Sequence, residues 1–328
     1  MIDNHRIRFE KPNLAELKKE NTVVDLHFHS HYSDGFNSIE AIATKAHNLG
    51  IGIAVTDHNE IRGAVEIDGY QGIFSIPGIE MTSREGTHIL IYFYQIDALE
   101  TFYSDHVIPY MGNDIMSSTE LEMEDIIKRA GQFKTVIIFP HPYCGVYTGI
   151  QNSYFPAERL EHLFSEVDGV EVINSENMNK SNLRSALLGF NLGKGITGGS
   201  DGHRVSQMGK VVTYAVCKPT RKAFLDAIKK KKTNVVGKEI DLIHKVTSNG
   251  VKLRNNIKNY PDLVEKNLKY SYTVINSKSK AIKENVKRSL NGKKRLRQKS
   301  NRKTSQKDFP SWTTRLSRGG FGGPESAI

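Results

Sequence analysis

Residues 25–33 read DLHFHSHYS and directly follow an apolar Val-Val pair. The β-branched run at this point predicts a buried strand over residues 22–30 that ends in polar side chains. Side chains alternate between the two faces of a strand, so His27 and His29 would share one face while Phe28 occupies the other. Two imidazoles on one face can bind the same cation, which makes this strand end the first candidate for a metal site.

The same strand begins a regular alternation of strands and helices. The next segment, residues 38–49, has apolar residues at helical spacing, a possible cap at Asn37 or Ser38, and Gly50 to close it. Six further segments predict strands: residues 52–59, 72–83, 87–95, 135–142, 168–175 and 195–203. This alternation predicts an α/β domain with a mainly parallel sheet.

Polar residues gather at the ends of these predicted strands. In a parallel sheet closed on itself, the carboxyl ends of all strands share one face, where barrel enzymes build their sites. His88 opens its strand, so it reaches this face only if that strand runs in the opposite direction. The other residues expected to converge are His27, His29, Asp34, Asp57, His58, Glu80, His141, Asp201 and His203.

The converging side chains are imidazoles and carboxylates, with no cysteine among them. Nitrogen and oxygen ligands suit Zn, Mn or Fe and argue against iron–sulfur chemistry. The set is too large for one tetrahedral ion, and ions roughly 3.5–4 Å apart, with a carboxylate bridging them, suit phosphoester hydrolysis. His31 lies in the loop beside this cluster and fits either role, and the plainer interpretation, a histidine without a metal, is preferred. Asp57 could instead orient His58.

Composition narrows the class of protein. The chain has 328 residues, of which 38% are hydrophobic and 25% charged, enough for one globular domain or two. No run reaches the roughly 18 apolar residues that a spanning helix needs. The first twenty residues are polar and lack the apolar region of a signal peptide. With only two cysteines and no disulfide framework, the expectation is a soluble, cytoplasmic protein without a membrane partner.

Charge divides the chain into two parts. Residues 1–217 hold 17 Lys and Arg against 28 Asp and Glu, whereas residues 218–328 hold 29 against 8. Such asymmetry indicates two parts with different partners. We therefore expect a catalytic domain over residues 1–236 and a basic extension over residues 237–328, partly helical, with about the last 40 residues disordered.

Six segments in this order resemble the PHP (polymerase and histidinol phosphatase) superfamily, in its stand-alone phosphoesterase branch. They are DLHFHSHYSDG (25–35), AVTDHNEIRG (54–63), IPGIEMTSREGTHIL (76–90), FPHP (139–142), GVEVINS (169–175) and TGGSDGHRVSQMG (197–209). The resemblance covers about residues 20–235 and rests on the order HxH, TDH, GxE, HP and SDxH. The segment after TDH is shorter than in many relatives, and the basic extension has no counterpart in the family.

The resemblance implies a distorted seven-stranded β/α barrel that holds two or three divalent ions. Position by position, it implies His27, His29, Glu80 and Asp201 for the first ion, Glu80, His88 and His141 for the second, and Asp34, His58 and His203 for the third. Glu80 would bridge the first two ions.

The implied activity is hydrolysis of a phosphomonoester, either a small phosphorylated metabolite or a nucleotide, by metal-activated water. Arg204 follows a predicted ligand and could clamp a phosphate with two hydrogen bonds, although a solvated loop charge is equally compatible with the sequence. Asn174, at the end of a predicted strand, could hydrogen-bond the substrate, whereas Glu171 on the same strand is interpreted as structural.

The basic extension supports an alternative function, that of a nuclease or nucleic-acid-binding protein. Residues 287–307 contain ten Lys and Arg and no Asp or Glu, so they would bind the phosphates of RNA or DNA without sequence preference and with strong salt dependence. A solvated tail without a partner is the plainer interpretation. A catalytically inactive binding module is disfavoured because every ligand position of the family is filled.

Overall fold

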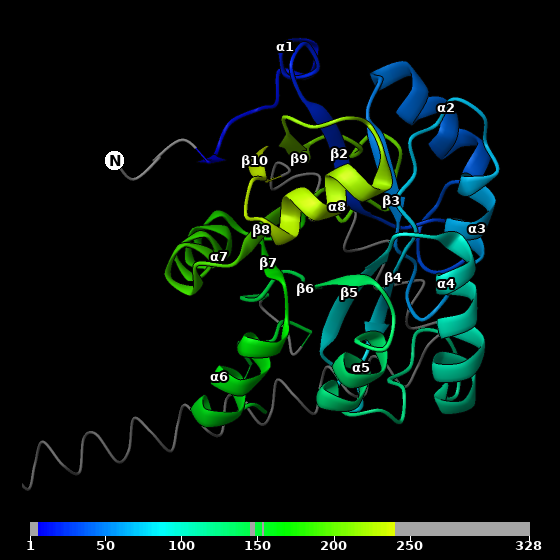
Figure 1. Cartoon of the computed structure of the whole chain (residues 1–328), viewed down its shortest axis with the longest axis vertical. Helices are drawn as coiled ribbons and strands as arrows, with labels where there is room; N and C mark the ends of the chain where they lie inside the picture. Colours follow the sequence, from blue (N-terminus) through cyan, green and yellow to red (C-terminus); the bar gives the residue numbers. More distant parts are fainter. Residues whose placement is uncertain (1–5, 145–147, 153, 240–328) are drawn as a thin grey trace, which may run out of the picture. The chain divides into compact units, whose positions relative to one another are not determined.

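The computed structural model describes residues 6–144, 148–152 and 154–239 (Figure 1). Its strands are β1 (Ile7–Arg8), β2 (Thr22–Phe28), β3 (Gly52–Val55), β4 (Gly78–Thr82), β5 (His88–Phe93), β6 (Thr135–Phe139), β7 (Gly169–Asn174), β8 (Gly195–Gly199), β9 (Val211–Ala215) and β10 (Asn234–Gly237). Its α-helices are α1 (Leu14–Leu17), α2 (Ile39–Leu49), α3 (Arg62–Asp68), α4 (Ile96–Phe102), α5 (Met123–Ala130), α6 (Ala157–Glu166), α7 (Asn179–Leu192) and α8 (Arg221–Lys229). A π-helix, η1 (Tyr103–Val107), and a 3₁₀ turn, η2 (Ile108–Tyr110), follow α4.

The strands form two five-stranded sheets. One has the order β1-β10-β9-β2-β3 and the other the order β4-β5-β6-β7-β8. All seven predicted strands are present, so the α/β class is confirmed. The sheets are mixed rather than mainly parallel, because β9 runs antiparallel to both β2 and β10, and β5 runs antiparallel to both β4 and β6.

The strand pairing does not form the single closed barrel that the resemblance implies. Between the two sheets, the described residues form only isolated parallel bridges, which pair Phe28 with Gly202, Ile53 with Ser75 and His58 with Glu80. The physical reason is that β3 and β8 stop short of their predicted ends. Asn59 and Asp201, next to two of these bridges, have φ of +46° and +50°, so regular strand geometry does not extend from the bridges.

Helix α2 shows how the local sequence sets the element boundaries. Ser38 caps it by accepting a hydrogen bond from the backbone N–H of Ala41 at 3.4 Å, and Gly50 ends it in the left-handed conformation with φ +63°. These are the cap and stop signals expected from the sequence. The helix buries Ile39, Ile42, Ala43 and Ala46, so its apolar face holds it against the first sheet.

Three strands were not predicted: β1, β9 and β10. The segment after the SDGH motif forms β9, whose Val211 and Val212 are fully buried, and β10 continues the sheet after α8. None of the described helices has the length and apolar character needed to span a bilayer. The predictions for residues 240–328, including the basic run at 287–307, lie outside the described residues.

Candidate metal centre

The nine predicted metal ligands converge at one place in the fold. His27 ends β2, Glu80 lies within β4, and His88 opens β5. Because β5 is antiparallel to β4 and β6, its first residue meets the ends of β4 and β6. The direction of β5 that His88 required is therefore confirmed. The others follow strand ends or lie in the connecting loops: His29, Asp34, His58, His141, Asp201 and His203.

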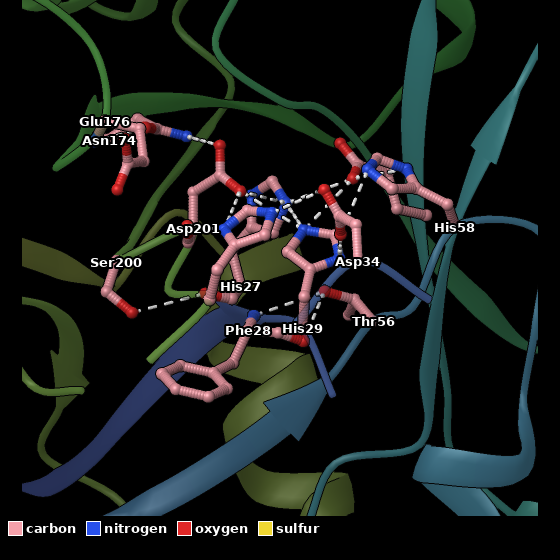
Figure 2. A network of polar contacts seen from close by, with 12 residues as sticks. His27, Phe28, His29, Asp34, Thr56, His58, Asn174, Glu176, Ser200 and Asp201 are labelled. Atoms are coloured by element: carbon pink, nitrogen blue, oxygen red, sulfur yellow. Dashed lines mark hydrogen bonds and ion pairs between the residues drawn. The ribbon is translucent and has the colours of Figure 1, made fainter. Parts of the chain in front are cut away.

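His27 and His29 point to the same side of β2, while the ring of Phe28 points to the other (Figure 2). Their Nε2 atoms are 3.2 Å apart. The Oδ1 atom of Asp201 lies 3.1 Å from the Nε2 atom of His29 and 3.6 Å from that of His27. The alternation read from the sequence therefore places two imidazoles and one carboxylate around a common point.

Glu80 lies at the centre of the cluster and is 1% exposed. Its Oε1 atom faces His88 Nδ1 at 3.0 Å and His141 Nε2 at 3.1 Å. Its Oε2 atom faces His58 Nδ1 at 3.1 Å and His27 Nε2 at 3.3 Å. The two carboxylate oxygens thus face two different groups of imidazoles, which is the geometry that a bridging ligand requires.

Asp34 organises a third group of side chains. Its Oδ2 atom is 2.8 Å from His203 Nε2, and its Oδ1 atom is 3.6 Å from His29 Nδ1 and 3.8 Å from His58 Nε2. Figure 2 shows this carboxylate directed at the histidines from the side opposite Asp201. Asp34 therefore extends the cluster beyond the His27–His29 pair.

The donor set fits divalent cations. Four groups of three side chains place one ligand atom each within 4.8 Å of one another: His27, His29 and Asp201; His27, Glu80 and His141; His29, Asp34 and His203; and His29, His58 and Glu80. Five buried atoms of the cluster lack a hydrogen-bond partner, namely His29 Nδ1, Asp34 Oδ1, His58 Nδ1, Glu80 Oε2 and His141 Nδ1. Buried polar atoms without partners are costly, and cations would satisfy those that face the cluster. His88 belongs to none of these groups, although it contacts Glu80.

Electrostatics keep the carboxylates ionised. Burial alone would raise the pKa of Glu80, but the charges of His88 and His27 hold it well below its usual range. The pKa of Asp34 is likewise held low, mainly by His203, against the effect of burial. Burial lowers the pKa of His58 to about 3, so this imidazole is neutral near pH 7. Ionised carboxylates and neutral imidazoles are the forms that bind metal ions, so ions would displace protons from His27, His29 and His141, whose pKa values the nearby carboxylates raise against the effect of burial.

Glu171 has a role that the sequence interpretation missed. Its Oε1 atom is 3.1 Å from His27 Nδ1, and its Oε2 atom accepts hydrogen bonds from the His141 backbone N–H and from Asn174 Nδ2, both at 2.9 Å. An acceptor at Nδ1 keeps the proton there and leaves Nε2 of His27 free to ligate. The signal was in the sequence, since a carboxylate within the apolar strand GVEVIN must have a specific partner.

Asn174 lies at the edge of the cluster and is 1% exposed. Its Nδ2 group donates to Asp201 Oδ2 at 3.2 Å as well as to Glu171. Its backbone exchanges two hydrogen bonds with the side chain of Asn182 on α7, at 3.1 and 2.9 Å. Asn174 therefore orients a predicted ligand, because its amide donors are occupied by carboxylates.

Asp57 supports the loop that carries the ligands and does not orient His58. Its carboxylate accepts hydrogen bonds from the Ser30 backbone N–H at 2.7 Å, from the Ser30 hydroxyl at 2.6 Å and from the Ser33 hydroxyl at 2.6 Å. His31, in the same loop, is exposed and lies against the ring of Tyr32. The prediction that His31 stays outside the cluster is consistent with this position.

Two of the predicted ligands have unusual backbone conformations. His141 has φ +31° and Asp201 has φ +50°. Non-glycine residues rarely adopt positive φ, and such conformations concentrate at functional sites, where surrounding contacts enforce them. At Gly199, a Cβ atom would lie 2.4 Å from Cβ of His27, so only glycine lets β8 approach the first ligand this closely.

Arg204 is exposed, and its guanidinium carbon lies 4.2 Å from the ring centroid of Phe36. Within the described residues it has no carboxylate partner. Arg84, by contrast, is paired with Glu122. Arg204 therefore offers a guanidinium next to His203 for binding an anion, and it packs against the ring of Phe36 rather than against an acid.

Comparison with known families identifies two matching segments. The family model described as "PHP domain" matches residues 25–160, and the model described as "PHP-associated" matches residues 179–233. None of the curated proteins compared with this sequence matches it.

Solved structures with a similar fold share little sequence with this chain. A two-domain protein from Bacteroides vulgatus, described as containing a predicted PHP-like metal-dependent phosphoesterase, is 18% identical, with 75% of this chain and 74% of that chain covered and a TM-score of 0.51. The lesion-specific endonuclease PfuEndoQ from Pyrococcus furiosus is 20% identical, with 66% and 57% covered and a TM-score of 0.53. PsfC from Pseudomonas syringae is 18% identical, with 72% and 99% covered and a TM-score of 0.51. At these identities the likeness concerns the fold alone.

Proposed function

The chain belongs to the PHP superfamily, and from this premise we propose that it is a metal-dependent phosphoesterase. The proposed substrate is a phosphomonoester, either a small phosphorylated metabolite or a nucleotide. One observation carries the proposal: the two oxygens of Glu80 face separate groups of buried imidazoles, as a carboxylate shared between two ions would. Two or three ions of Zn, Mn or Fe suit this donor set.

The ions would be held by the residues assigned from the resemblance: His27, His29, Glu80 and Asp201; Glu80, His88 and His141; and Asp34, His58 and His203. When bound, divalent ions supply positive charge that activates a water molecule and offsets charge on the phosphoryl oxygens. The geometry around Glu80, Asp34 and Asp201 supports these assignments. The assignment of His88 to the second ion is supported by its contact with Glu80 alone.

The protein's own side chains orient the centre and bind the substrate. Glu171 fixes the tautomer of His27, and Asn174 restrains the Asp201 carboxylate through a hydrogen bond of 3.2 Å. Arg204 is the proposed phosphate clamp, because a guanidinium offers two parallel donors to a phosphate and this one has no acidic partner among the described residues. Asn174 contributes to substrate binding only if it releases one of its two carboxylate partners.

A second candidate substrate is nucleic acid. The observation in its favour is the charge of the extension, with 22 Lys and Arg against 7 Asp and Glu over residues 237–328. We place the chemistry in residues 1–236 and assign to residues 237–328 the binding of a polyanion. If nucleic acid is the substrate, hydrolysis should fall steeply with added salt, because each neutralised phosphate releases counterions.

The test is a hydrolysis screen with Mn or Zn, using phosphomonoesters, nucleotides and short oligonucleotides as substrates. His29→Gln and His31→Gln form a matched pair, since the same substitution falls on a buried member of the cluster and on an exposed histidine two residues away. We expect His29→Gln to abolish hydrolysis and His31→Gln to retain it. Hydrolysis by folded His29→Gln at the wild-type rate would refute the proposal.

A further inference from the structure

Helix α7 exposes several large apolar side chains, while Leu188 and Leu192 are half-buried and pack against the core. Its buried residues are Asn182, Ser185 and Gly189, which are polar or small. A Cβ atom at Gly189 would lie 2.6 Å from the Val172 side chain, so the helix packs very closely on β7. Amphipathic helices normally bury their apolar stripe, which makes the outer face of α7 an anomaly.

The outer face of α7 carries a continuous apolar stripe. Leu183, Leu187 and Phe190 are 48, 64 and 61% exposed, and Met178, just before the helix, is 64% exposed. The three helical residues lie at positions i, i+4 and i+7, which align on one side of a helix. The described residues expose seven large apolar side chains, and four of the seven belong to this stripe. A clustered patch of this kind marks a binding surface, whereas single exposed apolar residues do not.

The described chain ends beside this face. After β10 it runs to Glu239, whose Oε1 atom accepts a hydrogen bond from Asn179 Nδ2 at 3.3 Å. Asn179 is the first residue of α7. The sequence that follows Glu239 therefore starts at one end of the exposed stripe and continues to residue 328.

The sequence that follows has a complementary pattern. Residues 240–246 read IDLIHKV, with Ile240, Leu242, Ile243 and Val246 as the apolar positions. At helical spacing these four fall on one side and the charged residues on the other. Seven helical residues rise roughly 10 Å, the same length that the stripe from Leu183 to Phe190 spans.

Charge also favours this segment as the occupant. The only charged residues of α7 are Lys180 and Arg184, and it contains no acid. Glu239 directly precedes the segment and Asp241 lies at its start, whereas its one basic residue, Lys245, lies near its end. Opposite charges flanking an apolar contact favour its formation and set its direction.

We propose that residues 240–246 pack against the outer face of α7 and cover Leu183, Leu187 and Phe190. This contact fixes the start of the C-terminal extension at the rim of the candidate metal centre, because Asn179 lies five residues after Asn174, whose side chain donates to Asp201. The inference concerns the fold of the full chain and does not depend on which phosphoester is hydrolysed.

The reactivity of an introduced cysteine tests the proposal in the full-length chain. Leu183→Cys places a thiol on the stripe, and Val216→Cys places one at a residue that is 81% exposed elsewhere. Maleimide labelling is read at each position by mass spectrometry with peptide fragmentation, which separates these thiols from Cys144 and from Cys217, the neighbour of position 216. We expect Leu183→Cys to react about tenfold more slowly than Val216→Cys, the effect of a contact formed nine-tenths of the time. Leu187→Cys gives a second position on the stripe.

Two substitutions in the segment identify the occupant. Added to Leu183→Cys, Ile243→Ser removes an apolar contact and should restore fast labelling, whereas Lys245→Ser, on the polar side, should leave labelling slow. The proposal is overturned if Leu183→Cys and Leu187→Cys react as fast as Val216→Cys, or if Ile243→Ser leaves their labelling slow. It is also overturned if the slow labelling becomes faster on dilution, because a second copy of the chain would then be the occupant.

Discussion

Replacing Glu171 with Gln should weaken metal binding without unfolding the protein. Glu171 accepts three hydrogen bonds, from His27 Nδ1 at 3.1 Å and from the His141 backbone N–H and Asn174 Nδ2 at 2.9 Å. A Gln side chain has one acceptor oxygen, so its NH2 group would face either His27 Nδ1–H or two other donors. One side of the residue therefore loses its hydrogen bonds, and the orientation of His27 or His141 is no longer enforced.

The size of the effect follows from the contacts that are lost. Loss of a carboxylate that orients a ligating histidine lowers metal affinity by about 10 to 100-fold, or roughly 1.4 to 2.7 kcal/mol. The assay is competition for Zn with a chromophoric chelator, with circular dichroism to verify the fold. Glu176→Gln is the matched control, since Glu176 lies near the same strand end and its carboxylate accepts a hydrogen bond from Gln207 Nε2, which a Gln oxygen can also accept.

For the control we expect a change in Zn affinity of less than about twofold. An affinity of Glu171→Gln equal to that of wild type, in a folded protein, would mean that Glu171 does not control His27. It would also mean that Glu171 does not set the tautomer of His27.

Three further outcomes are expected. Gly199→Ala should lower the free energy of unfolding in urea by about 1 to 3 kcal/mol, because the new Cβ would collide with His27; an unchanged midpoint would show that β8 can move away. Arg204→Ala should raise KM for a phosphomonoester about tenfold or more while leaving the bound metal unchanged, because it removes a charge-assisted phosphate contact; an unchanged KM would return Arg204 to the role of a loop charge. Dialysis against EDTA should abolish hydrolysis and lower Tm, since ligand at 100 times its Kd stabilises the folded state by about 2.7 kcal/mol; hydrolysis that continues after exhaustive dialysis would contradict metal dependence.

The parts of the centre that were predicted are those that local sequence controls. The alternation of His27, Phe28 and His29 sets which side chains share a face, whatever the rest of the chain does. Ser38 and Gly50 likewise set the ends of α2 through their own backbone preferences. The convergence of distant ligands could be anticipated because strand ends meet at the edges of sheets, so Glu80 and His141 come together although 61 residues separate them.

The parts that were missed depend on contacts between distant residues. The hydrogen bond between Glu171 and His27 joins residues 144 apart, and no local pattern specifies that pair. The bonds of Asp57 to Ser30 and Ser33 have the same origin, so its role beside His58 could not be assigned. The closed barrel was inferred from resemblance, but the two sheets are joined only by isolated bridges among the described residues, and Asn59 and Asp201 beside two of them have positive φ.

The central claim is that these side chains hold metal ions with Glu80 shared between two of them. Elemental analysis of the full-length protein, purified in Mn and Zn and then desalted, tests it most directly when wild type is compared with Glu80→Gln and Asp34→Ala. The account predicts two or three ions per wild-type chain, loss of two ions together in Glu80→Gln, and loss of one in Asp34→Ala. Wild-type protein without any bound transition metal would contradict it, and Glu80→Gln with full occupancy would exclude the shared carboxylate.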